Sequence, residues 1–586
     1  MKRSGLSRLG GFGPAAVLLM FLSRAAIAAT AQDVLNVDLS PLIDESAQYP
    51  TRFAVDLPHP VSMADAGSWT QSGGLSTWTY SIRVPTAVSM SFHADHVSLP
   101  AGAVLKVTGA NGASASYRTR DIARSGIWSR PLPGDSLLLS LTVETAARPQ
   151  TVLQIESFQA GYRGLGGSVA DNPHYRSLVD KQAGASPCME NYACYATNAN
   201  AGPGHATVAL VVANTSLCTG TLMNDTSGDG IPYVLTARHC ENGELGGGDP
   251  GAAANVTVYW DAVTPCGNAL GSIYDGNAIT QTGATTMVEQ QDAWLIQLDA
   301  PPAANDAYYA GWDATGGVFS GGYSIHHALG YDKQYVDWYG QPILLTIPGT
   351  TLQIGYASTF WGVVNSVGSV GAGASGGALF DPNNHAVGSA TLAQLVNGPN
   401  TAGVCPVASP PAPSPSTVTA MYTALSSVWS SNADTTSTTG TATLQSVLDA
   451  ANTAKLSFDG IAFLPITFAT NLTDAQTGQA VSLTWDAPRA QSCTATGGLG
   501  GDGWAGTVGA SGTVALTEGS GGQVTYTIRC TAPQPGWRGF LDHQLAVCAG
   551  HCANHGTLTG WSRREYGFAP MDGQHATLHR QWWHQR

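Results

Sequence analysis

The sequence predicts a mainly β protein that is divided into several folded units. Apolar runs that alternate with polar residues, such as residues 136–143, recur between clusters of Gly, Pro and Asn, and this pattern is typical of strands joined by turns. The chain has 586 residues, and because a domain usually has about 150 residues, three or four units are expected. With 43% hydrophobic residues, the chain has enough apolar material for packed cores.

Charged residues are scarce and mostly acidic. They make up 11% of the chain, against about 25% in a typical globular domain. The 25 Lys and Arg residues face 39 Asp and Glu residues, which gives a net charge of −14. Nucleic acids and anionic membrane surfaces attract basic proteins, so this balance argues against either of them as a partner.

The chain begins with the features of a secretory signal peptide, which we place at residues 1–29. Three basic residues precede an apolar stretch at 14–22 and a run of small residues at 25–29. The apolar stretch is too short to span a bilayer, and no later segment is long enough, so we expect an exported chain without a membrane span. In an extracellular or periplasmic compartment, the ten cysteines indicate disulfides before metal ligands.

The segment at 30–182 is predicted to be a separate β-rich unit. It contains strand-like runs and no cysteine, whereas the segment that follows holds six. This contrast indicates a unit with a different fate, and the simplest interpretation is a propeptide that is cleaved off near residues 181–183.

The segment at 183–460 is predicted to be an all-β unit closed by a short helix. Apolar residues at helical spacing predict that helix over residues 444–456. The Pro-rich stretch at 406–416 could be an interdomain linker. We favour an exposed loop, because a strand-like run at 418–425 and the helix both follow it before the composition changes.

The segment at 464–532 is predicted to be an immunoglobulin-like (Ig-like) sandwich. Its strand patterns carry Trp485, Cys493 and Cys530, and a bridge between the two cysteines would join two strands. The Trp lies before the first Cys, which departs from the order of antibody domains.

The remaining segment at 533–586 has little strand periodicity. It is rich in His, Arg and Trp and contains no Lys, and the sequence leaves open whether it is a genuine extension or an altered reading frame. Cys548, His551, Cys552 and His555 could be zinc ligands. A second pair of ligands at the usual spacing is missing, so we favour a local disulfide or free thiols.

Two polar residues stand next to apolar strands of the central segment. His239 follows an apolar run and precedes Cys240, and a bridge from Cys218 to Cys240 would hold the histidine in one orientation. Asp292 precedes the alternating run at 293–298. A single His is usually structural and a single Asp usually belongs to a turn, so neither residue carries a function alone.

A third element is the glycine-rich stretch at 371–377, which contains Ser375 and leads into an apolar strand. A flexible loop is the simplest interpretation. Glycines also let backbone N–H groups converge on an oxyanion without Cβ atoms in the way. The chain order His239, Asp292, Ser375 is that of the chymotrypsin class of serine hydrolases and differs from the orders of subtilisins and α/β-hydrolases.

The segment from Cys188 to Gly460 resembles the trypsin-like peptidases, and specifically the secreted bacterial lysyl endopeptidases. The resemblance rests on the stretches around the three residues above, on six cysteines, and on shorter matches such as Ala310–Asp313 and Ile325–His327. It extends into the preceding segment, where Leu99–Ala103 is similar to part of the propeptides of that branch. It implies a chymotrypsin-like double β-barrel and three bridges: Cys188 to Cys405, Cys194 to Cys266, and Cys218 to Cys240.

The resemblance also implies roles for the central residues. Ser375 would be the nucleophile, His239 the general base, Asp292 the group that orients the histidine, and the N–H groups of Gly373 and Ser375 the oxyanion hole. We therefore expect a monomeric serine endopeptidase that is made as a proenzyme, binds protein or peptide substrates and its own propeptide, and needs neither a metal nor an organic cofactor.

Two positions depart from the family pattern. Trypsin has an acidic residue just before the nucleophile, where this chain has Ala374. The lysyl branch has an Asp at the base of its specificity pocket, where this chain has Ser416. Between residues 339 and 432 the only acidic residue is Asp381, and there is no Lys or Arg. We therefore expect a neutral residue before the scissile bond.

Two other classes of function have less support from the sequence. A catalytically inactive homologue could use the barrel as an extracellular binding or adhesion scaffold, but the three catalytic residue types are all present. A metallopeptidase would need a motif such as His-Glu-x-x-His, which the sequence does not contain.

Overall fold

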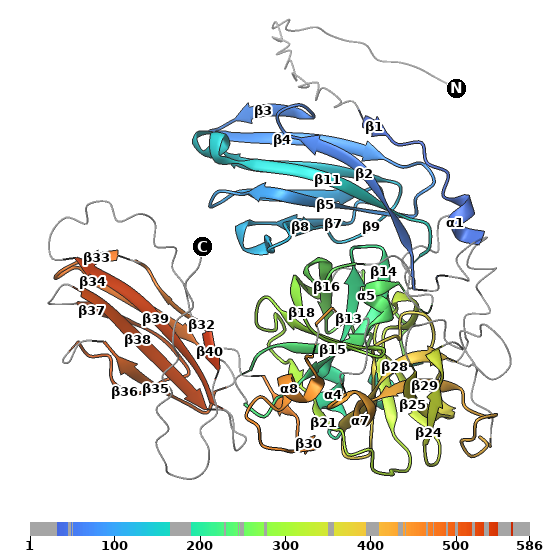
Figure 1. Cartoon of the computed structure of the whole chain (residues 1–586). Coiled ribbons are helices and arrows are strands. Elements are labelled where there is room, and N and C mark those ends of the chain that lie inside the picture. Colours follow the sequence, from blue (N-terminus) through green and yellow to red (C-terminus); the bar gives the residue numbers. More distant parts are fainter. Residues whose placement is uncertain are drawn as a thin grey trace, which may run out of the picture.

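The computed structural model is mainly β, as the sequence predicts, and the described residues form three β-rich units. We call residues 32–164 the N-terminal unit, 189–463 the central unit and 467–566 the C-terminal unit (Figure 1). The structure describes residues 32–44, 49, 51–164, 189–227, 230–243, 245, 251–274, 278–349, 357–393, 409–431, 438–439, 441–463, 467–472, 474–487, 490–498, 502–517, 522–531, 538–548 and 564–566.

The N-terminal unit consists of two sheets packed face to face. One sheet has the order β1-β4-β10-β6-β7, with β3 paired to β4, and the other has the order β2-β11-β5-β8, with β9 paired to β5. In β4 and β10 every second residue is buried, as expected for strands with one face on the core. The strands are β1 (Gln32–Val34), β2 (Ala54–Ser62), β3 (Ser68–Ser72), β4 (Leu75–Arg83), β5 (Ser89–Ser98), β6 (Val104–Gly109), β7 (Ser114–Tyr117), β8 (Ile127–Trp128), β9 (Leu132–Pro133), β10 (Ser136–Glu144) and β11 (Val152–Gly161). A short helix, α1 (Ser40–Asp44), precedes β2.

The first sheet of the central unit has the order β17-β16-β13-β14-β15-β19-β18. Its central strands are buried along their whole length, because other elements cover both faces. The strands are β13 (Thr207–Val212), β14 (Ser216–Met223), β15 (Tyr233–Ala237), β16 (Val256–Trp260), β17 (Ile279–Thr282), β18 (Ala284–Gln290) and β19 (Ala293–Leu298). The short helices beside them are α3 (Tyr192–Tyr195), α4 (Ala201–Ala206) and α5 (His239–Asn242).

The second sheet of the central unit has the order β12-β23-β22-β27-β28-β29-β25-β24, with β21, β26 and β30 attached at its sides. Both sheets curl into half-barrels, in agreement with the double-barrel prediction. The strands are β12 (Glu190–Asn191), β21 (Gly311–Asp313), β22 (Tyr323–His326), β23 (Gln334–Trp338), β24 (Ile343–Ile347), β25 (Ser358–Val363), β26 (Asn365–Val367), β27 (Ala378–Phe380), β28 (His385–Ala393), β29 (Ala420–Ala424) and β30 (Ser457–Phe458). Two helices, α7 (Leu425–Val428) and α8 (Leu444–Leu448), follow β29.

Two expectations about the end of the central unit have different outcomes. Of the Pro-rich stretch, the structure describes residues 409–416, which form no helix or strand and are half-buried or exposed, and β29, which follows them, pairs with β28; for these residues the loop prediction is confirmed. The helix predicted over 444–456 ends at Leu448. There the Asp449 carboxylate accepts hydrogen bonds from the N–H groups of Thr453 and Ala454, and these bonds compete with continuation of the helix.

The C-terminal unit has two sheets, ordered β32-β34-β37 and β33-β39-β38-β35-β36, with β40 paired to β39. Trp485 and Trp504 pack edge to face in its core. The strand pairing continues past residue 532, where we placed the end of the unit, because β39 pairs with β38 along its length. The strands are β32 (Thr467–Thr470), β33 (Asp474–Gln476), β34 (Ala480–Asp486), β35 (Ser492–Gly497), β36 (Gly506–Val508), β37 (Ser511–Thr517), β38 (Gly522–Thr531), β39 (Arg538–Cys548) and β40 (Arg564–Tyr566).

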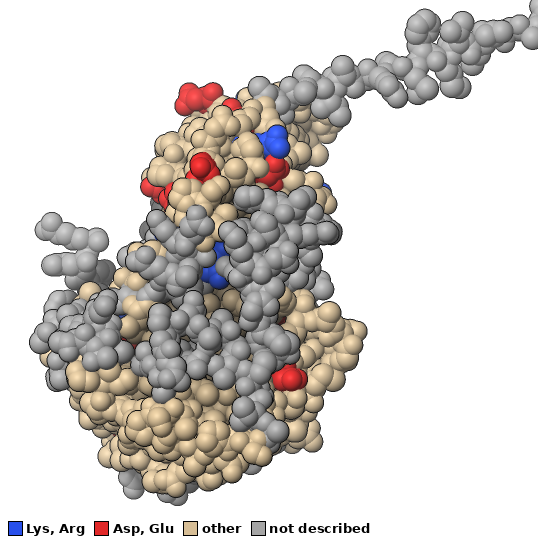
Figure 2. Space-filling view, turned by 90° about the vertical axis from the view of Figure 1, so that its right-hand side faces the viewer, with Lys and Arg blue, Asp and Glu red and all other residues tan. Residues whose placement is uncertain are grey.

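The surface agrees with the low content of charged residues. On the face drawn in Figure 2, uncharged side chains dominate the described surface, and most of the visible charged groups lie on the N-terminal unit. None of the helices in the described part of the chain is both long and apolar enough to cross a membrane.

Candidate active site

His239 and Asp292 are brought together by the pairing of β15 with β19. The two strands are antiparallel, with Ala237 opposite Ala293. His239 follows the end of β15 and begins the short helix α5, whereas Asp292 lies in the turn just before β19. The register of two neighbouring strands therefore places a base and a carboxylate side by side, at the same end of the sheet.

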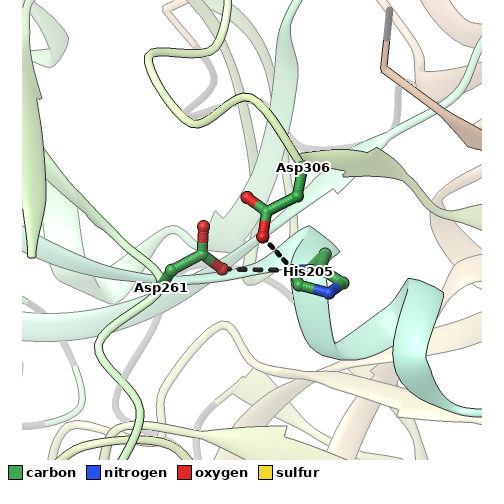
Figure 3. Close-up of side chains that lie close together, drawn as sticks. All are labelled: His205, Asp261 and Asp306. Carbon is green, nitrogen blue, oxygen red and sulfur yellow. Dashed lines mark hydrogen bonds and ion pairs between the residues drawn. The ribbon is translucent and has the colours of Figure 1, made fainter. Parts of the chain in front are cut away.

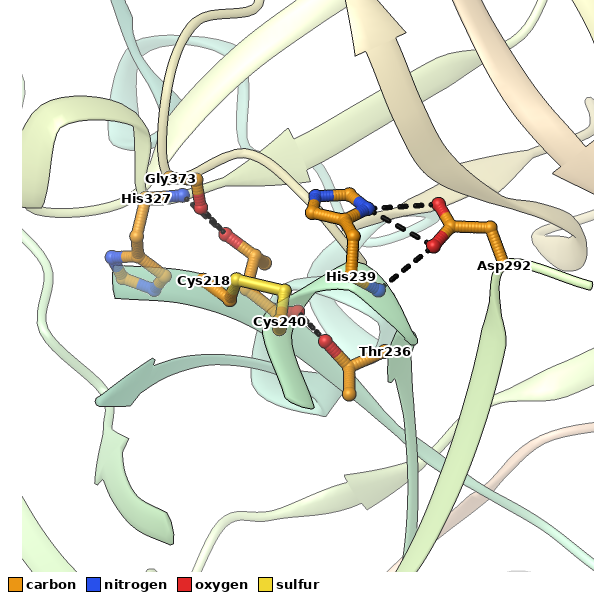
Figure 4. Close-up of a disulfide and its surroundings, with 8 residues drawn as sticks. Cys218, Thr236, His239, Cys240, Asp292, His327 and Gly373 are labelled. Carbon is orange, nitrogen blue, oxygen red and sulfur yellow. Dashed lines mark hydrogen bonds and ion pairs between the residues drawn. A yellow bond between two sulfur atoms is a disulfide. The ribbon is translucent and has the colours of Figure 1, made fainter. Parts of the chain in front are cut away.

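The imidazole ring of His239 is held by the carboxylate of Asp292 (Figure 4). Its Nδ1 atom lies 3.0 Å from Oδ1 and 2.9 Å from Oδ2, and the backbone N–H of His239 donates to Oδ1 at 2.9 Å. Both side chains are buried. The carboxylate fixes the tautomer of the ring as well as its orientation, because an Nδ1–H facing two oxygens leaves Nε2 as the acceptor.

A disulfide from Cys218 to Cys240 holds this histidine to the neighbouring strand, as predicted. Cys218 lies in β14, and Cys240 directly follows His239 in α5. The bridge therefore joins the base to the strand that carries Thr219.

Ser375 lies in a glycine-rich turn that is bound to β14. Thr219 donates its N–H to the Ser375 carbonyl at 2.7 Å and its hydroxyl to the Gly373 carbonyl at 2.7 Å. Gly376 has a φ of +87°, and a Cβ atom there would collide with Thr236 and Ala237 in β15. Only glycine allows this close approach, so the turn stacks directly on the strand that leads to His239.

The backbone N–H groups on either side of Ala374 are available to a ligand. Ala374 donates its N–H to Gly371, and Gly376 donates its N–H to Ala390. Within the described part of the chain, the N–H groups of Gly373 and Ser375 have no acceptor. Gly373 has a φ of +93°, a conformation that a residue with a side chain rarely adopts.

Three ionisable side chains, two of them within two residues of His239 in the chain, form a cluster beside the helix α5. Arg238 and Glu289 are both buried, with Nη2 and Oε2 3.8 Å apart. Burial would raise the pKa of Glu289, but two hydrogen bonds from Thr438 and a hydrogen bond with Glu241 hold it below its ordinary value. Burial raises the pKa of Glu241 to about 8, reinforced by its hydrogen bond to Glu289 and the charge of that residue. At neutral pH the proton of this carboxyl pair therefore resides on Glu241, and Glu289 is the anion that faces Arg238.

A small cavity opens beside Ser375 on the second sheet. The residues that line it share one property, the lack of a charged side chain. They are Val370, Gly371, Ala374, Ser375, Ala390, Thr391, Leu392, Ala420, Met421 and Tyr422. A cation or a carboxylate that entered this cavity would find no charged partner among these residues.

The structure places two residues considered for this pocket elsewhere. Ser416 is exposed, bonds to Ser414, and is not among the residues that line the cavity. Asp381 is buried in the turn between β27 and β28, where one of its oxygens accepts the N–H groups of Asn383 and His385. It does not line the cavity either.

Two further groups bring His and Asp side chains within ligand distance of one another. In the first, His205 Nδ1 lies 3.3 Å from Asp261 and 3.4 Å from Asp306 (Figure 3), and the buried Lys333 lies 3.3 Å from Asp261. Burial would raise the pKa of Asp261, but the hydrogen bond with His205 and the charge of Lys333 hold it below its ordinary value. A lysine therefore already supplies the cation in this group. The second group contains Asp313, Asp381 and His385, and Asp381 is engaged in its turn.

The remaining predicted bridges have mixed outcomes. Cys194 is bonded to Cys266, and Cys493 to Cys530, as predicted. Cys188 and Cys405 lie outside the described residues, as do His551, Cys552 and His555 of the tail.

Sequence reasoning missed several residues of this site. Thr219 and Leu217 follow no motif, and only the pairing of β14 reveals that they contact the serine turn. Glu241 and Glu289 carried a usable signal, because acidic residues beside a buried histidine are unusual in a chain with so few charges.

One comparison with known families bears on these observations. Residues 183–406 match the family model described as lysyl endopeptidase, C-terminal domain. The match covers the histidine, the aspartate and the serine turn, and it identifies this part of the chain as related to peptidases. Peptidases act on proteins or peptides, so the substrates belong to that class.

Proposed function

We propose that the chain is a secreted serine endopeptidase that works through Ser375, His239 and Asp292. Ser375 attacks the carbonyl carbon of the scissile bond while His239 Nε2 takes its proton, and Asp292 stabilises the imidazolium that results. His239 then returns the proton to the leaving amine, which leaves an acyl-enzyme. Water hydrolyses the acyl-enzyme by the same steps, so no metal or organic cofactor is needed.

One observation carries this proposal: the two free N–H groups lie in the same turn as the serine, and that turn is stacked on the strand leading to a carboxylate-bound histidine. An oxyanion hole requires donors whose hydrogen bonds are not already made within the protein. The N–H groups of Gly373 and Ser375 meet this requirement, whereas those of Ala374 and Gly376 do not. An inactive scaffold would have no need of this arrangement.

The cavity beside Ser375 supports a neutral residue before the scissile bond. Selection of Lys or Arg requires a buried carboxylate, since a cation taken out of water without a partner costs several kcal/mol. The cavity lining has no charged side chain, and the sequence between residues 394 and 408 contains no Asp or Glu. This specificity would differ from that of the lysyl endopeptidases.

The proposal includes a maturation pathway. Residues 1–29 direct export, residues 30–182 are a propeptide cleaved off near 181–183, and the C-terminal unit is an Ig-like appendage. The disulfides in the central and C-terminal units are consistent with an extracellular location.

Labelling with a fluorophosphonate, followed by peptide mass mapping, tests the proposal. In these reagents the serine oxygen attacks phosphorus and displaces fluoride, so only serines whose hydroxyl is activated by a neighbouring base are phosphonylated. We expect one adduct, on Ser375, and its loss in the His239→Gln variant. Unlabelled protein, with the fold intact by circular dichroism, would favour the binding scaffold instead.

A further inference from the structure

The N-terminal unit contacts the central unit through the main chain. Leu217 donates its N–H to the carbonyl of Thr51 at 2.9 Å, and Phe53 donates its N–H to the carbonyl of Thr215 at 2.8 Å. Arg52 and Ser216 form an antiparallel bridge between these two bonds. Residues 51–53, which lead into β2, therefore pair as a short strand with the start of β14 (Figure 1), the mode by which sheet edges bind extended peptides.

This edge of β14 belongs to the wall of the active site. Leu217 is two residues before Thr219, which binds the serine turn, and a Cβ atom on Gly373 would lie 2.7 Å from the side chain of Leu217. Leu217 is not among the residues that line the cavity beside Ser375. The edge therefore adjoins the serine turn outside this cavity.

Polar anchors hold the two units together away from this edge. Arg124 donates to the Ala284 carbonyl at 2.8 Å and forms an ion pair with Asp299 at 3.5 Å. Arg130 donates to the Ala278 carbonyl at 2.8 Å, and its guanidinium lies over the ring of Tyr259. The N-terminal unit thus supplies cations, and the central unit supplies their acceptors.

The packing between the units is incomplete. A cavity of about 670 Å³ lies between them, with Tyr117, Arg124 and Arg130 on one side and Tyr259, Gln281 and Asp299 on the other. The units share a small apolar cluster, in which Phe53 and Ala54 pack with Leu217 and Tyr259. Away from this cluster their contacts are polar and surround a partly open space, as is typical of partners that separate.

We propose that the N-terminal unit inhibits the central unit by pairing residues 51–53 with the Thr215–Leu217 edge. This proposal rests on the peptidase function proposed above. An extended peptide that places one side chain in the cavity beside Ser375 must continue past the serine turn, and the Thr215–Leu217 edge lies there. While the N-terminal unit is docked, its own main chain occupies the hydrogen-bonding groups of this edge.

Two measurements on the same full-length, uncleaved chain test the proposal. The rate of fluorophosphonate labelling reports on Ser375 itself, because the reagent is too small to need the edge. Hydrolysis of a peptide with three residues on each side of the scissile bond requires the edge. Samples are taken before cleavage is detectable on a denaturing gel, and the ratio of hydrolysis to labelling is compared between variants.

We expect a low ratio in the wild type and a higher one when the anchors are removed. The Arg124→Ala, Arg130→Ala double variant should raise the ratio roughly tenfold or more, since each charged hydrogen bond contributes at least about that factor to docking. Asp299→Ala removes the partner of Arg124 on the central unit and should also raise the ratio of hydrolysis to labelling. This variant replaces the double variant if the latter does not fold. Arg148→Ala is the matched control, because Arg148 packs over Trp69 within the N-terminal unit.

The inhibition is wrong if the wild type, the Arg124→Ala, Arg130→Ala double variant and Asp299→Ala are all labelled and all have the same ratio of hydrolysis to labelling. The proposed peptidase function would be unaffected by that result. Failure of labelling in every form, including cleaved protein, would overturn the proposed function and the inhibition with it.

Discussion

The two sheets of the central unit contribute opposite kinds of side chain to one site. The first sheet contributes buried charge: Asp292 behind His239, and Glu289 paired with Arg238 beside it. The second sheet contributes the serine turn and a cavity whose lining has no charge. In the function proposed here, the charge of Asp292 orients His239 as the base. The cavity that would hold the substrate side chain has no charged group.

The largest effect is expected from removal of the proposed nucleophile, Ser375, which lies where the two sheets meet. Ser375→Ala should lower kcat by about 10⁶-fold, because the members of a triad act as a unit. The fold should be unchanged, because the contacts of the serine turn with β14 are made by the main chain. Turnover of purified variant and wild type checks this, and a variant with a tenth of wild-type turnover would rule out Ser375.

The next largest effect is expected from the loss of one buried charge. Two aspartates, Asp292 beside the first sheet and Asp381 in a turn of the second, allow the two sheets to be compared. Asp292→Asn should lower kcat by about 10⁴-fold, because the amide stabilises the wrong tautomer of the histidine. Asp381→Asn, in the turn of the second sheet, should leave kcat nearly unchanged. Similar losses of kcat in both variants, with both folded, would show that charge matters equally on the two sides.

The uncharged cavity predicts a preference among substrates. Peptides that differ only in the residue before the scissile bond should be cleaved with kcat/KM at least about a hundredfold higher for Leu or Met than for Lys, because an unpaired buried cation costs several kcal/mol. Cleavage confined to Lys would mean that a carboxylate from another part of the chain reaches the cavity.

The smallest expected effect concerns the stability of the charged side. The pKa of Glu241 is raised to about 8 in the folded chain, whereas it is about 4.3 in an unfolded one. Between these values the folded state holds the extra proton, so this contribution to stability is present at low pH and is lost as the pH rises to 8.

Glu241→Gln should remove this loss. The test measures the urea concentration that halves activity, at pH 5 and at pH 8. This concentration should be lower at pH 8 than at pH 5 in the wild type, and the difference should be smaller in the variant. The exposed Asp486→Asn, in the C-terminal unit, serves as a control and should behave as the wild type does. If the urea midpoint changes with pH in the same way in all three proteins, Glu241 does not hold an extra proton in the folded state.

The sequence allowed the three residues of the proposed triad to be located better than their surroundings. His239, Asp292 and Ser375 each adjoin a strand with a clear pattern, so their order and positions could be assigned. Thr219 and Leu217 could not, because their role depends on which strand lies beside the serine turn, and pairing is a long-range property. The strand β39 was missed for a related reason: its partner β38 stabilises it, and its own pattern is weak.

The helix predicted over 444–456 shows the opposite error. Its periodicity is real, but the carboxylate of Asp449 satisfies the N–H groups that would have continued it. Periodicity reports which face of a segment is buried, and it does not report competing hydrogen bonds. Likewise, the assignment of Ser416 to the pocket followed the alignment of one residue in a loop, where spacing is least constrained.

The close approach of Gly376 to Thr236 and Ala237 has a consequence for the order of events during biosynthesis. Ser375 reaches its place only when the turn from the second sheet has settled against β15 of the first, with no room for even one extra carbon atom between them. With Ser375 as the nucleophile proposed above, a chain with one sheet formed and the other unfinished has a histidine and an aspartate but no seated nucleophile. The proposed function therefore makes completion of the whole central unit a precondition for hydrolysis, so that partly folded molecules would not digest one another.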